Sequence, residues 1–214
     1  MKFVPAIIAV FAFAACGNEA GSVGGGEIAK SLLTASTAKL KGAAPADLGL
    51  TREALEQVET PVLLATIDSR GQQALLGEVQ QNQGVATWST LDDVTVSFRN
   101  GVIVATRGLG NDLMASDGLA VSRQAGTKSR IYTHLDGEDK SVRRRFSCNV
   151  LPRGSEVIEI VEVSYTTLRV SENCSADGAV FQNDYWFSSD QKIRKSRQWI
   201  SDDVGYLTVE DLRR

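Results

Sequence analysis

The stretch VTVSFRNGVIVATR, residues 94–107, constrains the fold of this chain more than any other. It places Asn100-Gly101 between two runs in which apolar and polar residues alternate, the sequence signature of a β-hairpin with a type I′ turn. A two-residue loop fixes the register of the two strands, and the predicted pairs are Arg99 with Val102 and Phe98 with Ile103. One face of the hairpin is then apolar and the other mixed, which indicates an antiparallel sheet with one buried side.

Other runs rich in apolar and β-branched residues recur along the chain. Strands are expected at 62–67, 74–79, 84–90, 129–137, 141–151, 156–173, 180–188, 192–200 and 205–212. In the run 156–173 the alternation changes parity near Glu162, which we interpret as a bulge or strong coil within one long strand. The pattern predicts a mostly β fold, a curved antiparallel meander sheet that is half-barrel or barrel-like.

Helical patterns occur only near the N-terminus. The segment EIAKSLLTASTAKLK, residues 27–41, has apolar residues at near-helical spacing, and TREALEQVE, from Thr51, reads as a second short helix that Pro61 ends. The segment GLGNDLMASDG, residues 108–118, is expected to be a glycine-punctuated loop. We therefore expect one or two short N-terminal helices beside the sheet.

The chain begins with a segment that has the features of a secretory signal peptide. Lys2 supplies a positive charge, and the apolar run 3–15 ends in small residues directly before Cys16. The run is too short to span a bilayer, which needs roughly 20 apolar residues. The alternative is an ordinary signal followed by a chance cysteine. Ala14 and Ala15 before Cys16, and the stretch GNEAGSVGGG after it, disfavour that alternative.

The leader resembles a bacterial lipoprotein signal in the segment Phe13-Ala14-Ala15-Cys16. The resemblance implies that residues 1–15 are a signal peptide that is removed, and that Cys16 then carries lipid on its sulfur and its amino group. Acyl chains at about 0.8 kcal/mol per buried methylene would anchor the protein to a membrane. Gly17 rather than aspartate follows the cysteine, and similarity to sorting signals of Gram-negative bacteria implies the outer membrane.

The rest of the chain suits a single domain. Removing residues 1–15 from the 214 leaves 199 residues, enough for one sizeable core. We expect a lipidated cysteine and glycine-rich tether over 16–26, then one β-rich periplasmic domain over 27–214. Loss of Lys2 changes the formal net charge from −3 to −4, which is not the basic balance of a nucleic-acid-binding protein.

Two cysteines remain once Cys16 carries lipid. In an oxidising compartment Cys148 and Cys174 are expected to form a disulfide, the alternative being a buried pair of free thiols. The two are 26 positions apart, and a loop of that size is worth about 3.5 kcal/mol on the chain-entropy model.

Candidate catalytic residues are few. His134 is the only histidine, and without a GxSxG motif it reads as a polar strand residue near a turn rather than a triad member. Asp92-Asp93 and Asp202-Asp203 read as turn residues, because adjacent strand residues point to opposite faces and make poor acid–base partners. Two cysteines and one distant histidine are too few for a metal site. We expect no catalytic activity, no cofactor and no metal.

Two basic pairs are candidates for an anionic ligand. Arg143 and Arg145 share a strand face, as do Lys195 and Arg197. If the two strands are neighbours, the four residues form a positive surface for an anionic polysaccharide or a lipid head group. The alternative is a solvated outer face. Three tryptophans could stack on sugar rings, although large aromatics in strands are more often core residues: Trp88, Trp186 and Trp199.

Two motifs carry a family resemblance. TWSTLDDVTVSFRNGVIVATRGLGNDL, residues 87–113, resembles the core motif of the YjbF/GfcB-type group 4 capsule polysaccharide lipoproteins, although Asp92-Asp93 stands where Asp-Gly is expected. RKSRQWISDDVGYLTVE, residues 194–210, is similar to the C-terminal pattern of that family. The resemblance implies an outer-membrane lipoprotein of a capsule or exopolysaccharide operon that accompanies an outer-membrane β-barrel and periplasmic partners. It carries over Cys16 and no catalytic residue.

Three functions follow as hypotheses. The leading one is a lipid-anchored, non-enzymatic periplasmic protein that assists assembly or secretion of a capsule or exopolysaccharide by contacting glycan or secretion partners. The second is a carrier that holds an acyl chain in an apolar concave face, resembling lipoprotein-sorting chaperones. The third is a hydrolase built around His134. A filled core would disfavour the carrier, and a cleft holding His134 beside a serine or carboxylate would favour the hydrolase.

Overall fold

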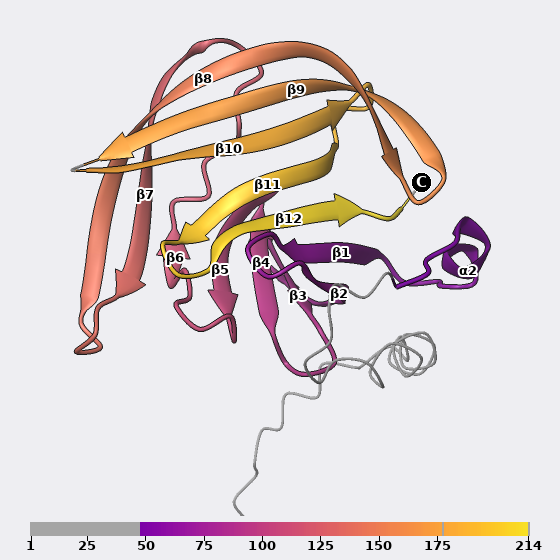
Figure 1. Ribbon diagram of the computed structural model, residues 1–214, viewed down its shortest axis with the longest axis horizontal. Helices are drawn as coiled ribbons and strands as arrows, with labels where there is room; N and C mark the ends of the chain where they lie inside the picture. Colours follow the sequence, from indigo (N-terminus) through magenta and orange to yellow (C-terminus); the bar gives the residue numbers. More distant parts are fainter. Residues whose placement is uncertain (1–47, 177, 214) are drawn as a thin grey trace, which may run out of the picture.

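The computed structural model describes residues 48–176 and 178–213, and these residues form one antiparallel sheet with a short helix beside it (Figure 1). The twelve strands lie in the order β5-β4-β3-β2-β1-β12-β11-β10-β9-β8-β7-β6. Every strand except β1 and β12 therefore neighbours only strands adjacent to it in sequence. Pairing of β1 with β12 joins the two runs of this meander, with Leu64 opposite Glu210.

Strands occupy every segment that was expected to be extended, although the run 156–173 is divided between two of them. Their bounds are β1 (Val62–Ile67), β2 (Gln72–Asn82), β3 (Val85–Ser89), β4 (Thr95–Arg99), β5 (Val102–Arg107), β6 (Ala115–Ser116), β7 (Gly126–Leu135), β8 (Ser141–Ile160), β9 (Val163–Ala176), β10 (Ala179–Ser188), β11 (Ile193–Ser201) and β12 (Gly205–Asp211). The two-residue strand β6 lies within the segment 108–118, for which the sequence predicted a loop with a possible helical turn and no strand.

The sheet curls until its two ends meet. The Thr106 backbone N–H of β5 donates to the carbonyl of Leu113 (2.9 Å), just before β6, and the Ser116 hydroxyl of β6 donates to the carbonyl of Ile103 (2.9 Å). These bonds join the edge strands without a full ladder, so the sheet is barrel-like and nearly closed. The predicted fold class, a curved antiparallel meander that is half-barrel or barrel-like, is confirmed.

The hairpin at 94–107 forms as expected at its turn. Asn100 and Gly101 both have positive φ (52° and 74°), and the pairs Arg99 with Val102 and Phe98 with Ile103 are present. The register then shifts, because Ser97 pairs with Ala105 and leaves Val104 as an extra residue on β5. The simple register predicted for the whole hairpin is therefore wrong beyond its first two pairs. Such a bulge bends a strand and increases its twist, which suits an edge that curls toward β6.

The run 156–173 is not one strand. Val161 and Glu162 have φ values of 41° and 63° and form a tight turn, so the chain reverses between β8 and β9. The alternation changes parity there because the chain turns back, and the predicted bulge or coil near Glu162 is wrong. A register shift occurs instead between Pro152 and Gly154 of β8.

One expected helix is present and the other lies outside the described residues. Helix α2 (Arg52–Glu56) begins after Thr51, whose hydroxyl accepts a hydrogen bond from the Ala54 N–H. It is shorter than the predicted helix and ends well before Pro61. The helix predicted at 27–41 falls in the part of the chain that is not described.

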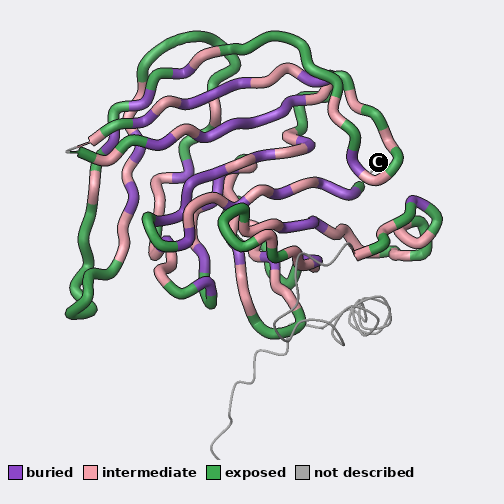
Figure 2. Tube along the Cα trace, viewed as in Figure 1, coloured by how far each residue is buried: buried purple, intermediate pink, exposed green. Residues whose placement is uncertain are grey.

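Buried positions alternate with exposed ones along the strands (Figure 2). The inner face of the sheet is filled by a large apolar cluster, at whose centre Phe181 stacks on Trp199 (4.6 Å between ring centroids) and on Tyr132 (5.5 Å). A smaller cluster lies on the outer face, where α2 and the β8–β9 turn cover Leu64 and Leu75. The concave face is thus occupied by the protein's own side chains.

Candidate functional site

One end of the barrel-like sheet is open and carries a group of hollows. Helix α2, the start of β1 and the end of β12 lie at this end, next to the C-terminal residues (Figure 1). We call it the rim. The first hollow, here called the mouth pocket, has a volume of about 370 Å³ and lies between β1–β4 and β11–β12. Its lining includes Glu78, Gln81, Trp88, Phe98, Asn100 and Arg213.

Two further hollows adjoin the mouth pocket along the rim. One of about 500 Å³ shares five lining residues with it: Asn100, Gly101, Ile193, Asp211 and Arg213. The other, of about 740 Å³, lies under the β8–β9 hairpin and shares Arg123 and Phe187 with the second. The three hollows therefore follow one another along the rim.

Arg213 forms one wall of the mouth pocket. Its Nε and Nη2 donate to the two carboxylate oxygens of Asp211 (2.8 and 2.9 Å), and its guanidinium lies 5.8 Å from the ring centroid of Trp88. Donation of these hydrogen bonds to Asp211 raises the pKa of Arg213, although partial burial acts the other way. The charge of Asp211 is thus largely neutralised at this site.

Arg52 fixes the geometry of the rim from the other side of the sheet. Its guanidinium donates to the carbonyls of Ile160 (2.9 Å), Val161 (3.0 and 3.2 Å) and Leu212 (2.8 Å). Its backbone N–H also donates to the carboxylate of Glu162 (3.0 Å). One buried side chain therefore ties α2, the β8–β9 turn and the C-terminal end of the chain together.

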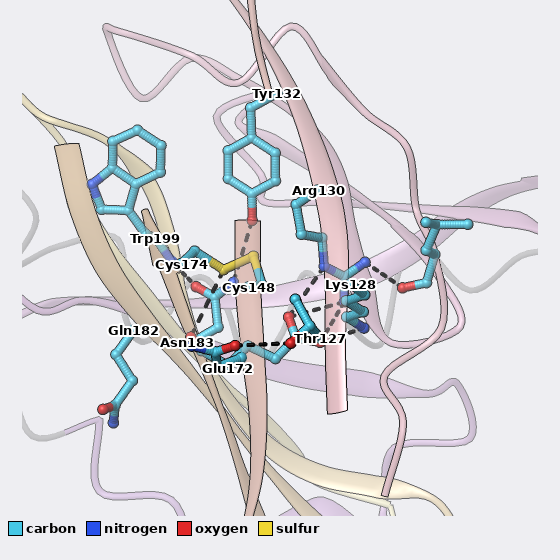
Figure 3. Close-up of a disulfide and its surroundings, with 12 residues drawn as sticks. Thr127, Lys128, Arg130, Tyr132, Cys148, Glu172, Cys174, Gln182, Asn183 and Trp199 are labelled. Atoms are coloured by element: carbon cyan, nitrogen blue, oxygen red, sulfur yellow. Dashed lines mark hydrogen bonds and ion pairs between the residues drawn. A yellow bond between two sulfur atoms is a disulfide. The ribbon is translucent and has the colours of Figure 1, made fainter. Parts of the chain in front are cut away.

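A second set of charges is enclosed inside the sheet, beside the disulfide (Figure 3). The Arg130 guanidinium, fully buried, donates to both carboxylate oxygens of the equally buried Glu172 (2.9–3.1 Å), and the Lys128 ammonium also contacts Glu172. Asp117 lies 3.6 Å from Arg130. All these groups have partners within the protein, so the cluster holds β7 against β9 and leaves no charge for a ligand.

Burial and charge shift the pKa values in this cluster. Burial, together with the nearby Arg130 charge, lowers the pKa of Lys128 despite the opposing effect of Glu172. Burial raises the pKa of Tyr132 to about 12, and raises that of Tyr185 well above 10. Both tyrosines therefore stay neutral hydrogen-bonding groups: the Tyr132 hydroxyl accepts from the Asn183 amide (3.3 Å), and the Tyr185 hydroxyl donates to Gln198 (3.4 Å).

The expected disulfide is present. Cys148 of β8 and Cys174 of β9 lie directly opposite each other, 4.0 Å apart at Cα, and both are fully buried. The bond joins two adjacent strands near the end of the sheet away from the β8–β9 turn. Cys16, the expected lipidation site, lies outside the described residues, and its lipidation remains a prediction.

The structure does not bring the two basic pairs together. Arg143 and Arg145 lie on β8 and Lys195 and Arg197 on β11, and β9 and β10 separate these strands. The condition of neighbouring strands is therefore not met. The Lys195 ammonium also lies 2.7 Å from Glu210, and the Arg197 Nε donates to Asp68 at 2.6 Å. Anion binding by either pair alone remains a prediction.

His134 occupies a structural position. Its Nε2 lies 2.7 Å from the Ile200 carbonyl, and its ring packs edge-on against Trp199 at 5.6 Å. Within residues 48–176 and 178–213, no serine or carboxylate hydrogen-bonds to this ring. Asp92 and Asp203 lie in turns, where Asp92 accepts from the Thr90 hydroxyl (2.5 Å) and Asp203 from the Asn111 amide (2.7 Å).

The tryptophans are buried, but they differ in setting. Trp199 belongs to the inner cluster, and Trp88 lines the mouth pocket. The Trp186 indole N–H donates to Glu156 (3.1 Å), and its ring lies between Arg169 and Lys195, at 5.1 and 5.8 Å. The expectation of core positions is confirmed. Only Trp88 adjoins a hollow among those described here.

Sequence reasoning missed the residues that shape the rim. Arg52, Glu78, Gln81 and Arg213 belong to no motif and come from segments far apart in the chain. A lone arginine in a short helix carries no sign that it will be buried. Only the pairing of β1 with β12 and the curl of the sheet bring these residues near one another.

The described residues contain neither a helix suited to span a membrane nor a cluster of metal-ligating side chains. The only helix described is the five-residue α2, so none is long and apolar enough to cross a membrane. Within the described ranges, no three histidine, cysteine, aspartate or glutamate side chains gather as metal ligands would.

Comparison with known proteins points to one family. The family model described as group 4 capsule polysaccharide lipoprotein gfcB, YjbF matches residues 29–212, which confirms the resemblance at 87–113 and 194–210. No curated protein matches the chain. Among solved structures, the hypothetical lipoprotein YmcC from Escherichia coli (K12) is similar with a TM-score of 0.68 and 15% identity, over 85% of this chain and 94% of that one. At this identity the likeness shows a shared fold.

Proposed function

Because the chain belongs to the group 4 capsule polysaccharide lipoprotein family, YjbF/GfcB, we propose that it assists the assembly or secretion of a capsule or exopolysaccharide without catalysing a reaction. The observation that carries the proposal is the extent of the family match. Residues 29–212 include the whole sheet and α2, so the likeness is to the entire folded unit and not to one motif.

The proposed location is the outer membrane of a Gram-negative bacterium, with the domain facing the periplasm. Residues 1–15 act as a signal peptide, lipid on Cys16 anchors the protein, and 16–26 form the tether to the domain at 27–214. Leu48, the first described residue, leads into α2 at the rim. This arrangement supports attachment of the anchor at the end of the sheet that carries the hollows.

The proposed partners follow from this location. They are the polysaccharide itself, an outer-membrane β-barrel and periplasmic secretion proteins. The rim is the surface we assign to the glycan, because its three adjoining hollows form an extended open track. Open concavities whose linings mix polar and apolar groups suit a soluble polymer that carries both hydroxyls and apolar faces.

The other two hypotheses find less support. The carrier needs an apolar concave interior, but the inner face is filled by the aromatic cluster around Phe181, Trp199 and Tyr132. The hydrolase needs His134 beside a nucleophile or carboxylate, but its Nε2 contacts the Ile200 backbone carbonyl. Both observations favour a binding role over a carrier or an enzyme.

The test is a deletion of the gene followed by measurement of surface polysaccharide. Complementation uses wild type and Cys16→Ala, with protein levels checked by immunoblot. We expect polysaccharide to fall severalfold on deletion and to be restored by wild type only. Unchanged polysaccharide in the deletion strain would overturn the proposed function. Restoration by Cys16→Ala would show that anchoring is not part of it.

A further inference from the structure

The geometry of the mouth pocket points to a ligand class: we propose that it binds an uncharged sugar unit within a longer saccharide chain. The proposal rests on the proposed function, since that function supplies a polysaccharide in the same compartment. The groups that line the pocket, and the way they are already paired within the protein, indicate the ligand class.

The floor of the pocket is aromatic. Trp88 and Phe98 line it from β3 and β4, with Ala86 and Leu63 beside them. Within the described residues no group accepts a hydrogen bond from the Trp88 indole N–H, and no fully buried side-chain polar atom lacks a partner. Trp88 is only 4% exposed, but its indole nitrogen is not fully buried and offers an unpaired donor at the edge of the apolar floor. A sugar ring presents the matching pair, an apolar C–H face edged by hydroxyls.

A second wall of the pocket is polar, and its side chains are free to hydrogen-bond to a ligand. Glu78, Gln81 and Asn100 have no side-chain hydrogen-bond partner within residues 48–176 and 178–213. They supply a carboxylate that only accepts and two amides that both donate and accept. Such a mixture satisfies a polyol, whose hydroxyls act as donors and acceptors at once. An acyl chain would instead strip these groups of water without replacing their hydrogen bonds.

The charge of the pocket selects against acidic sugars. Asp211 is paired with Arg213 through two hydrogen bonds, and Glu78 has no ion-pair partner within 4.0 Å among the described residues. The charge of Glu78 also raises the pKa of Arg213, so the lining holds two carboxylates and one guanidinium. An acidic sugar carboxylate placed here would meet the Glu78 carboxylate, and like charges at close range are unfavourable. The basic side chains of the adjoining hollow, Arg123 and Lys192, lie outside the mouth pocket. An uncharged sugar unit is therefore the better fit.

The pocket is open at its side, which suits a unit inside a chain. It shares Asn100, Gly101, Ile193, Asp211 and Arg213 with the next hollow along the rim. A saccharide with one unit on the Trp88 floor can continue through this shared wall. A pocket for a single free sugar would enclose its ligand on all sides.

The test measures binding by the full-length lipoprotein in a detergent without a sugar head group. The probe is the surface polysaccharide of the source bacterium, cut by mild acid into oligosaccharides and separated by anion exchange into an uncharged and an acidic pool. Binding is followed by intrinsic fluorescence, which reports on Trp88 among three tryptophans, and by saturation-transfer NMR.

The variants are matched pairs on one exposed stretch of β2. Glu78→Ala with Gln81→Ala removes two wall groups, whereas Gln80→Ala with Asn82→Ala changes two exposed neighbours that line no hollow described here. All four positions are exposed, so both double variants should fold, as circular dichroism will verify. We expect the uncharged pool to bind wild type and the control equally, and the Glu78/Gln81 variant about tenfold or more weakly.

Each other outcome overturns the proposal. Equal binding by both variants would place the site elsewhere, and no binding of either pool to wild type would remove it. Preference of the wild-type protein for the acidic pool would refute the ligand class. In that case the Glu78 carboxylate would not repel acidic sugars, and Glu78→Gln should leave the preference unchanged. None of these results bears on the deletion phenotype, so failure of this site and failure of the proposed function remain distinguishable.

Discussion

Two of the buried arginines among the described residues, Arg130 and Arg52, hold distant segments of the chain together. Arg130 reaches from β7 to Glu172 on β9, and Arg52 reaches from α2 to the β8–β9 turn and to Leu212. A buried charge without partners is costly, so each arginine demands that its acceptors stay in place. The Val161 turn also needs this support, because a β-branched residue rarely adopts a positive φ.

Replacement of Arg52 should therefore destabilise the whole fold. Arg52→Leu removes every guanidinium bond to Ile160, Val161 and Leu212 and should lower the free energy of unfolding by about 3 kcal/mol. Arg52→Lys keeps the charge but not the fork of donors and should recover part of the loss. Urea denaturation measures both. The exposed neighbour Glu53→Ala serves as the control, and a loss of the same size there would contradict this role.

The raised pKa of Tyr132 predicts a loss of stability at alkaline pH. Its pKa rises from 10 in the unfolded chain to about 12 in the fold, so its contribution is complete below pH 10 and is lost as the pH approaches 12. The loss should reach up to about 3 kcal/mol. Lys128 has a lowered pKa in the fold, so its contribution to stability increases as the pH rises, but only up to about pH 10.5.

Denaturation curves at several pH values between 8 and 12 test this account. Tyr132→Phe should be less stable at pH 8, because it loses the bond from Asn183 (3.3 Å), but its stability should fall less steeply above pH 10. Curves that stay parallel to wild type would show that Tyr132 does not titrate with unfolding.

At the scale of single residues, prediction from sequence depended on whether a residue type has one common use. In an oxidising compartment the common use of two cysteines is a disulfide, and Cys148 and Cys174 form one. Basic strand residues have no single common use, because they can bind a ligand or neutralise an acidic neighbour. Lys195 pairs with Glu210, and Arg197 pairs with Asp68. Arg52 gave no signal at all, since its acceptors are backbone carbonyls more than 100 residues away.

At the scale of elements, some turns could be predicted from the sequence and others could not. The turn at Asn100-Gly101 was predictable because both residues tolerate positive φ, which a type I′ turn requires. The turn at Val161-Glu162 was not, because neither residue favours that conformation and the flanking run reads as one strand. The bulge at Val104 was hidden as well, since it depends on how β5 curls toward β6.

The turn at Asn100-Gly101 also packs against β11. A Cβ at Gly101 would lie 2.5 Å from the Ile193 Cδ1, and its φ of 74° disfavours any other residue. Gly101→Ala should therefore destabilise the protein by about 2 kcal/mol. Asn100→Gly keeps the turn geometry and should change stability little. Thermal unfolding of the two variants compares them directly, and equal melting temperatures would contradict the contact.

The disulfide links β8 to β9 and should matter for stability more than for shape. Replacing both Cys148 and Cys174 by alanine should cost about 3.5 kcal/mol on the chain-entropy model. Wild type treated with a reductant should approach the variant in urea denaturation, once unfolding exposes the buried bond. A variant as stable as wild type would show that the barrel-like sheet does not depend on the crosslink.

For the molecule as a whole, the meander order followed from the regular spacing of strands, because sequential strands usually pair. Pairing of β1 with β12 and near closure between β5 and β6 did not follow, since they depend on the curl of the complete sheet. The rim exists only because of these two long-range events. A candidate glycan site built from Glu78, Trp88 and Arg213 could therefore be found in the structure and not in the sequence.

If this protein assists polysaccharide assembly or secretion through binding at its rim, loss of the rim side chains should lower surface polysaccharide. The most direct test is the amount of surface polysaccharide made by a strain whose only copy carries Glu78→Ala and Gln81→Ala, beside a strain with Gln80→Ala and Asn82→Ala. We predict a severalfold fall in the first strain and wild-type polysaccharide in the second, at equal protein levels. Wild-type polysaccharide in both strains would contradict the claim.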